Sequence, residues 1–193
     1  MTSILKADTI QDTDGNNIIN ENSNTITIGA SGDTTNIVGT LQNNGAAVGG
    51  TNTPAFFARL SSDQSISNET NTIVQFNSEV FDSDSAYDNS SNYRFTIPSG
   101  KAGKYFLYTT AQVNYSNPSR LLILKFYKNG SEFGKFTNIT AAGNDLSGSI
   151  QIVDDASVGD YYDVRIYQND GTRTISGHST RNISVFGAFK IIE

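Results

Sequence analysis

The stretch "SRLLILKFYKNG", Ser119 to Gly130, decides the fold of this chain. Successive side chains of a β-strand point to opposite faces of its sheet. Apolar residues occupy both sets of positions here: one face receives Leu122, Leu124 and Phe126, and the other receives Leu121, Ile123 and Tyr127. One face can pack into the core of the chain's own domain. The other needs a second cover, either a further part of the same chain or another subunit.

The sequence after Pro54 repeats this strand pattern. Short runs rich in β-branched and aromatic residues alternate with turn signals, at the spacing typical of an all-β sandwich. The expected strands are 55–60, 72–76, 93–97, 103–115, 121–130, 131–139, 147–155, 160–170 and 182–192. The "KNG" at 128–130 and the "NDG" at 169–171 predict tight hairpin turns. The fold class is therefore all-β with a jelly-roll or sandwich topology.

Aromatic residues recur on the second face of several of these strands. A contiguous apolar patch on an outer sheet face marks an interface. We therefore predict an oligomer, and the alternative is coverage by an extra sheet or loop of the same chain. The predicted subunit interface comprises Leu121, Ile123, Tyr127, Tyr105, Leu107, Tyr161, Tyr167 and Phe186.

The amino-terminal part has a different composition. Isolated isoleucines are spread among Asn, Thr, Asp and Gly, as in "NNIINENSNTITIGASGD", and Ile26 and Ile28 alternate with Thr as in a strand. Such a segment buries too little apolar surface to order itself alone. The predicted organisation is an extended β-rich stem or anchor at 1–44, a linker at 45–53 and a head domain at 54–193.

Composition excludes several classes of partner. The net charge is −6, and the thirteen Lys and Arg residues are scattered, which argues against nucleic acid. No apolar run is long enough to insert into a membrane. Without cysteine there is neither a disulfide nor a thiolate metal site. The first residues lack the pattern of a signal peptide, so we expect synthesis in the cytoplasm without export.

From Pro54 onward the chain resembles the C1q/TNF-like jelly-roll family. The resemblance rests on stretches that occur in the family's order: "PAFFARL", "VQFNSEVFDSDSAYD", "YRFTIPSGKAGKYFLY", "YKNG", "VGDYYDV" and "SVFGAFKI". Two loops depart from the family's pattern, at "SGKA" before Gly103 and at "FDSDS" after Val80. The resemblance implies a ten-stranded jelly roll assembled as a tight homotrimer, in which partner subunits cover the second face.

The amino-terminal segment resembles the N-terminal segments of structural and tail-fibre proteins of tailed bacteriophages. The two resemblances together imply a virion protein: a trimeric tail fibre or spike whose head binds a glycan or protein of the host surface. The alternative is a purely architectural head fibre, capsid decoration or tail connector without receptor binding. In either case the predicted contacts to other virion proteins are Ile4, Leu5, Ile10, Ile18 and Ile19.

Catalytic signals are weak. The single histidine, His178, has no acid within a few residues, and no Gly-x-Ser-x-Gly turn occurs. A glycan-degrading spike would need two carboxylates facing each other across a groove. The acids Asp154, Asp155, Asp160 and Asp163 occur instead in turn contexts typical of Asp. We therefore predict that the protein is not an enzyme.

Two further sets of residues are candidates for binding. In "DSDSAYD", Asp82, Asp84 and Asp88 offer oxygen ligands suited to calcium, although an acidic solvated loop is the favoured interpretation and no other cofactor is indicated. The loops that would meet a receptor carry polar side chains suited to sugar hydroxyls. These candidates are Tyr115, Arg120, Asn144, Asp145, Arg173, His178 and Arg181.

Overall fold

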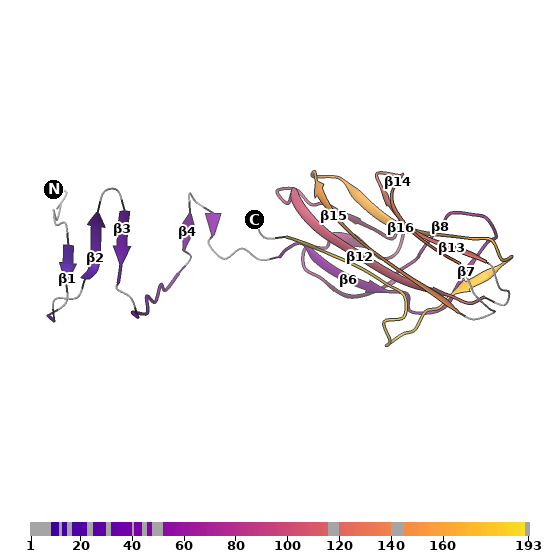
Figure 1. Ribbon diagram of the computed structural model, residues 1–193, viewed down its shortest axis with the longest axis horizontal. Coiled ribbons are helices and arrows are strands. Elements are labelled where there is room, and N and C mark those ends of the chain that lie inside the picture. Colours follow the sequence, from indigo (N-terminus) through magenta and orange to yellow (C-terminus); the bar gives the residue numbers. More distant parts are fainter. Residues whose placement is uncertain are drawn as a thin grey trace. The chain divides into compact units, whose positions relative to one another are not determined.

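The computed structural model describes residues 9–11, 13–14, 17–22, 25–29, 32–39, 41–43, 46–47, 52–115, 120–139 and 145–191. The chain divides into two compact units, Met1–Gly50 and Thr51–Glu193, which we name the N-terminal unit and the head (Figure 1). The described residues form strands and connecting turns. Within them no helix is long and apolar enough to cross a membrane.

The N-terminal unit is built from short antiparallel strands. Strands β1 (Thr9–Gln11), β2 (Asn17–Asn22) and β3 (Thr25–Ile28) form a three-stranded meander in chain order. Strands β4 (Gln42–Asn43) and β5 (Ala46–Ala47) form a separate small pair. The alternating Thr and Ile residues of 25–28 thus form a strand, as their period of two predicted.

The head consists of two antiparallel sheets. The first, named the β12 sheet, has the order β7-β17-β12-β18-β6-β9, with β15 on the other side of β12. Its strands are β6 (Ala55–Arg59), β7 (Gln64–Ile66), β9 (Ser78–Asp82), β12 (Gly103–Val113), β15 (Leu146–Ala156), β17 (Arg173–Ile175) and β18 (Val185–Lys190). The second, the β16 sheet, has the order β10-β11-β16-β13-β14, and β8 also pairs with β16. Its strands are β8 (Thr72–Ile73), β10 (Tyr87–Asp88), β11 (Arg94–Thr96), β13 (Leu121–Lys128), β14 (Ser131–Ile139) and β16 (Tyr161–Gln168).

The inner faces of the two sheets enclose one hydrophobic core. At its centre the ring of Phe56 stacks on Tyr87 and Phe95, with centroid distances of 4.6 and 4.9 Å, and meets Phe186 edge-on at 4.8 Å. Offset stacked and edge-to-face pairs of this kind add to the free energy gained from burial. The aromatic pairs join β6 and β18 of one sheet to β10 and β11 of the other.

The two faces of strand β13 differ in burial. Leu122, Leu124 and Phe126 are completely buried in the core, whereas Leu121 and Ile123 lie half-buried on the outer face of the β16 sheet. The predicted hairpin at 128–130 is present, since Lys128 pairs with Ser131 across Asn129 and Gly130, which both have positive φ.

Other local predictions were wrong or missing. The "NDG" at 169–171 is not a hairpin turn, because β16 and the following β17 belong to different sheets. Instead, the side-chain carbonyl of Asn169 accepts a hydrogen bond from the Leu121 amide at 2.7 Å. Strands β7, β9, β10 and β17 were not expected. Apart from β9 they are two or three residues long, and such short segments give no readable alternation.

Candidate functional site

The outer face of the β12 sheet carries a row of aromatic side chains, which we name the aromatic face: Phe57, Phe81, Phe106, Tyr108 and Phe189. The ring centroid of Phe57 lies 6.3 Å from those of Phe81 and Tyr108. The ring of Phe106 lies 5.9 Å from Tyr108 and 5.4 Å from Phe189. These rings therefore form one contiguous surface across β9, β6, β18 and β12.

Solvent reaches the aromatic face at both edges. Phe81 on the edge strand β9 is 51% exposed. On the opposite side Val153 of β15 pairs in register with Phe106 and is 59% exposed. A contiguous apolar surface on a sheet whose other face forms the core is typical of a protein interface.

Gly187 shapes the middle of the aromatic face. It pairs in register with Tyr108 across β18 and β12, and a Cβ atom at position 187 would collide with the phenol group of Tyr108. The missing side chain lets the Tyr108 ring lie down over the neighbouring strand. Partial burial in this position raises the pKa of the Tyr108 hydroxyl.

Three residues predicted for the subunit interface lie in the core instead. Tyr105, Leu107 and Phe186 have no exposed surface in the single chain, so a second copy has nothing of them to contact. The predicted alternation along β12 and β18 is correct, but the prediction that Tyr105, Leu107 and Phe186 face outward is wrong. Tyr105 faces inward, where its hydroxyl donates a hydrogen bond to the Lys101 carbonyl at 2.6 Å, and burial raises its pKa to about 12.

The remaining predicted interface residues, Leu121, Ile123, Tyr127, Tyr161 and Tyr167, are half-buried on the β16 sheet. The three tyrosine rings on this face lie next to cationic side chains of the same chain. The Arg165 guanidinium lies 3.9 Å from the Tyr127 ring centroid, that of Arg94 lies 4.3 Å from Tyr161, and the Lys125 ammonium lies 6.0 Å from Tyr167. Cation–π contacts thus provide a cover for this face within one chain.

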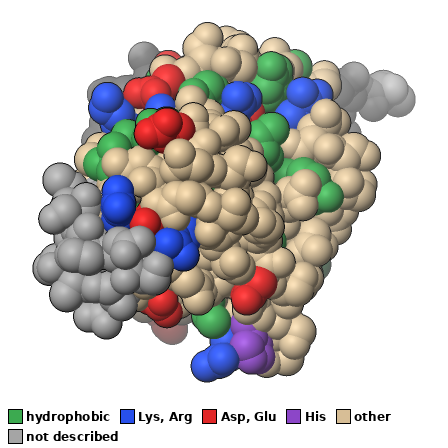
Figure 2. Space-filling model, turned by 90° about the vertical axis from the view of Figure 1, so that its right-hand side faces the viewer, with side chains coloured by type: hydrophobic (Ala, Val, Ile, Leu, Met, Phe, Trp, Pro, Cys, Tyr) green, Lys and Arg blue, Asp and Glu red, His purple; other side chains and the backbone are tan. Residues whose placement is uncertain are grey.

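Several of the residues predicted to contact a receptor instead form hydrogen bonds with backbone groups of the head itself. Tyr115 is buried, and its hydroxyl donates to the Leu121 carbonyl at 3.0 Å. His178 Nδ1 accepts hydrogen bonds from the amides of Thr180 and Arg181, both at 3.1 Å. Figure 2 shows the end of the head near β7 and β8, where basic and acidic side chains are interspersed over the surface.

An ion-pair cluster joins two of these loops. The buried carboxylate of Asp170 lies 3.1 Å from Arg120 Nε and 2.8 Å from Arg173 Nε. Asp145 is exposed, and Asn144 lies outside the described residues. The structure thus unites Arg120 and Arg173 around Asp170, a residue that sequence reasoning missed because an Asp before Gly indicates only a turn.

The three aspartates of the predicted calcium loop do not converge. Asp82 accepts the Tyr87 amide at 2.8 Å, and Asp84 lies 3.3 Å from Lys101 Nζ. Asp88 accepts backbone N–H groups of its own turn, first among them Ser91, and these hold its pKa well below the usual range. Within the described part of the chain, no three acidic or histidine residues are arranged to hold a metal ion. The structure does not support the calcium site.

Most of the acids weighed for catalysis are bound to cations. Lys128 Nζ lies 2.6 Å from Asp154 and 3.0 Å from Asp160, and the Tyr162 hydroxyl donates to Asp154. Asp163 lies 2.6 Å from Arg165 Nε, while Asp155 is exposed. Lys128 thus joins the end of β13 to Asp154 on β15 and to Asp160 before β16, whereas Asp163 pairs with Arg165 within β16.

Three isoleucines of the N-terminal unit form a row. Ile10, Ile19 and Ile28 pair in register across β1, β2 and β3, and they are 39%, 37% and 55% exposed. Two of the residues predicted to contact other virion proteins, Ile10 and Ile19, belong to this row. Ile4 and Leu5 lie outside the described residues, and for Ile18 only its place in β2 is described.

Comparison with solved structures shows which fold the head has. The globular domain of a zebrafish complement 1qA protein matches with a TM-score of 0.53 and 17% identity, over 72% of this chain and 98% of that one. The structure of Eiger TNF from S. frugiperda matches with a TM-score of 0.51 and 11% identity, over 72% of this chain and 92% of that one. No family model and no curated protein sequence matches. The head is thus an all-β domain similar to C1q and TNF jelly rolls, as the sequence motifs predicted.

Proposed function

We propose that this protein is a homotrimer in which the aromatic face of each copy is buried against the other two. The observation that carries the proposal is the contiguous row Phe57, Phe81, Phe106, Tyr108 and Phe189, with Val153 beside it, on a sheet face that the described residues leave open. Burying one large apolar side chain is worth ~1.5–3 kcal/mol. Several per subunit support an obligate assembly rather than a transient contact.

The proposal places the interface on the β12 sheet and leaves the β16 sheet facing solvent. Two observations support this choice. The rings of the β16 sheet have cations over them, as at Tyr127 and Arg165. The rings of the aromatic face contact one another, and Phe81 and Val153 at its edges are more than half exposed. Desolvating the β16 sheet would require the burial of charged groups, which costs free energy.

We further propose that this trimer is a tail fibre or spike of a bacteriophage virion, whose head binds the host surface. The resemblance of the N-terminal segment to phage structural proteins supports this context. The row of Ile10, Ile19 and Ile28 provides an apolar surface by which the N-terminal unit attaches to another virion protein. A small three-stranded sheet needs a cover on its apolar face to be stable.

A purely architectural role is the second candidate, and one observation favours it. Several side chains expected to meet a receptor are engaged in holding their own loops, among them Tyr115, His178 and the arginines around Asp170. A head of this kind would act as a capsid decoration, head fibre or tail connector. No catalytic role is part of either proposal.

Sedimentation equilibrium of the full chain tests the assembly. The expected mass is three times the 20.8 kDa of one chain. Phe81→Asp places a charge on the aromatic face and should shift the mass toward the single chain. Phe133→Asp is the matched control, because Phe133 is 41% exposed but lies on β14 of the other sheet. A wild-type protein that sediments as a lone subunit at low concentration would overturn the trimer.

Electron microscopy of virions labelled with antibodies against the head tests the context. Label on the tail together with adsorption of the purified trimer to host cells supports the fibre or spike. Label on the capsid, without adsorption, supports the architectural candidate. Particles that carry no label would refute the virion assignment altogether.

A further inference from the structure

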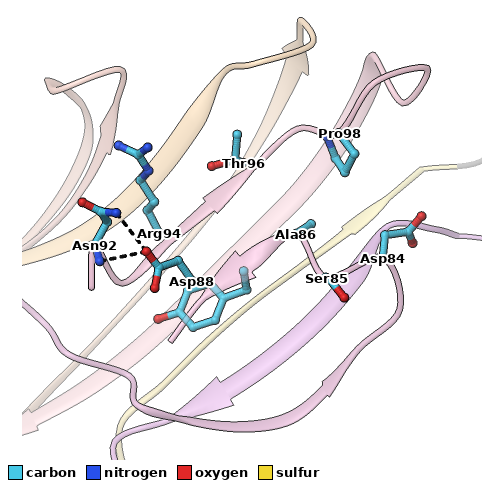
Figure 3. A pocket seen from close by; sticks show the side chains of 9 residues that line it. Asp84, Ser85, Ala86, Asp88, Asn92, Arg94, Thr96 and Pro98 are labelled. Carbon is cyan, nitrogen blue, oxygen red and sulfur yellow. Dashed lines mark hydrogen bonds between the residues drawn. The ribbon is translucent and has the colours of Figure 1, made fainter. Parts of the chain in front are cut away.

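A hollow of about 330 Å³ opens on the head beside the β10–β11 hairpin (Figure 3). None of the five rings of the aromatic face is among its lining residues. Its walls include Ala86, Asp88, Asn92, Arg94, Thr96 and Pro98. Concave sites that combine an apolar surface with a few fixed polar groups are the usual form of small-molecule sites. The volume suits one or two sugar rings and is too small for a folded partner.

Asp88 and Asn92 form a fixed polar wall. Asp88 accepts the backbone N–H groups of Ser90, Ser91 and Asn92 at distances of 3.0, 2.9 and 3.0 Å. The side-chain amide of Asn92 also donates to Asp88, at 2.9 Å (Figure 3). Because this bond uses the NH₂ group, the Asn92 carbonyl oxygen is held in place as an acceptor. Groups fixed in this way lose little entropy when a ligand binds.

Arg94 supplies the donors. Its guanidinium stacks on the Tyr161 ring at 4.3 Å from the centroid, which fixes the plane of its N–H groups. Among the described residues no carboxylate forms an ion pair with Arg94, in contrast to Arg165, which lies 2.6 Å from Asp163. The hydroxyl of Thr96, two residues further along β11, adds a group that both donates and accepts.

The charges of the pocket nearly cancel. Asp84 at one end lies 3.3 Å from Lys101 Nζ, and Asp88 at the other end shares the pocket with Arg94. A phosphate or an acidic sugar would meet a carboxylate at either end, whereas a free cation would meet Arg94. A neutral ring with hydroxyl groups avoids both repulsions, and its C–H face can rest on the apolar surfaces of Ala86 and Pro98.

We propose that this pocket binds a neutral sugar residue, with hydroxyl groups that hydrogen-bond to Asn92, Arg94 and Thr96 and a C–H face against Ala86 and Pro98. This inference deepens the host-surface binding of the proposed function and rests on it. It assigns recognition to the β10–β11 side of the head rather than to the loops at 115–120 and 169–182.

Ligand-observed NMR on the full chain tests the proposal, with glucose, galactose, mannose and rhamnose as separate probes. At least one of them should show saturation transfer from the protein. Arg94→Met keeps an apolar stem over Tyr161 but removes the donors, and it should weaken binding about tenfold. Thr96→Val keeps the β-branched shape and should weaken binding about threefold to tenfold. Thr137→Val on β14 is the matched control and should leave binding unchanged.

Three results would overturn the proposal: saturation transfer to none of the four sugars, tighter binding of glucuronate or inorganic phosphate, or equal affinity of the Arg94→Met and wild-type proteins. An assay of adsorption to host cells distinguishes failure of the sugar pocket from failure of the proposed host-surface binding. If wild type and Arg94→Met adsorb equally well, host binding stands and the pocket is wrong. If neither protein adsorbs and no sugar binds, both are wrong.

Discussion

The phenol group of Tyr108 occupies the space that a side chain at Gly187 would fill. Glycine usually weakens the interior of a strand, because it offers nothing to pack. Here the aromatic ring of the facing strand takes over that packing, and the ring becomes part of the aromatic face. The relationship links one residue of the sequence to both the stability of the β12 sheet and the shape of its outer surface.

Replacing Gly187 tests this relationship. Gly187→Ala should lower the free energy of unfolding by about 1–3 kcal/mol, because the added methyl group displaces the Tyr108 ring. Urea denaturation measures the change. In a Tyr108→Ala background the same substitution should cost clearly less, since the collision is gone. Equal costs in the two backgrounds would mean that the ring and the glycine act independently.

Asp88 should make stability depend on pH. The amides of Ser91 and Ser90 lower its pKa in the folded state, so its stabilising effect is complete above the ordinary carboxyl pKa and is lost as the pH falls below it. At neutral pH, Asp88→Asn should be less stable than wild type by about 1 kcal/mol, given the partial exposure of the site. The difference should begin to shrink as the pH falls below the ordinary carboxyl pKa of about 4, and it should disappear only when the pH reaches the much lower pKa of the folded state. Asp155→Asn, at an exposed position, serves as control.

The buried tyrosines should determine the highest pH at which the protein stays folded. Burial raises the pKa of Tyr105 to about 12 and raises those of Tyr87 and Tyr162 as well. Their stabilising effect is complete below about pH 10, the pKa in the unfolded chain, and is lost as the pH rises above it. In an alkaline titration followed by phenolate absorbance, a group of tyrosines should therefore ionise only well above pH 10. Their ionisation should coincide with the loss of near-UV circular dichroism. Ionisation of every tyrosine near pH 10 in a folded protein would contradict this.

Lys128 joins two strand ends and should matter for stability. Its ammonium lies between Asp154 and Asp160, so Lys128→Met would leave two half-buried carboxylates without their cation. The expected loss is about 2 kcal/mol in the free energy of unfolding. Lys135→Met is the matched control, because the Lys135 side chain is 60% exposed and should change stability by less than about 0.5 kcal/mol. Thermal or urea unfolding of both variants measures the contrast.

The two sheet faces should differ in their effect on assembly. Tyr127→Ser removes a ring that Arg165 already covers, so the sedimentation mass should stay that of the wild type. Phe106→Ser removes a ring at the centre of the aromatic face and should shift the mass toward the single chain. The opposite ranking would return the interface to the β16 sheet.

Much of the fold could be predicted because its long strands alternate. Strands β12, β13, β15 and β16 are each eight or more residues long, so the alternation of their side chains between the two faces extends over enough positions to be recognised. The motif order from Pro54 onward then indicated the jelly roll. The short strands β7 and β17 pair with each other, although they lie about a hundred residues apart in the chain, and no local pattern indicates such a pairing.

The candidate site could be predicted only in part. Alternation separated Phe106 and Tyr108 from Tyr105 and Leu107, but two apolar faces look alike in sequence, and burial alone decides between them. The sequence of β16 nevertheless contains a usable signal. On β16 the outward tyrosines share their face with Asp163 and Arg165, and charged neighbours indicate a face that meets water and pairs its own charges. The pocket beside β10 depends on the pairing of β10 with β11 and could not be read from sequence.

The pairing of β6 with β18 has a consequence for synthesis. These are the first and last strands of the head, and Ala55 pairs with Phe189. During translation the opening strand must wait, without its neighbour, until β18 has left the ribosome, and such distant pairings form slowly. Until then the β12 sheet, and with it the aromatic face, is incomplete. In the proposed trimer, sister polypeptides would therefore recognise each other only after β18 of each copy has joined its sheet.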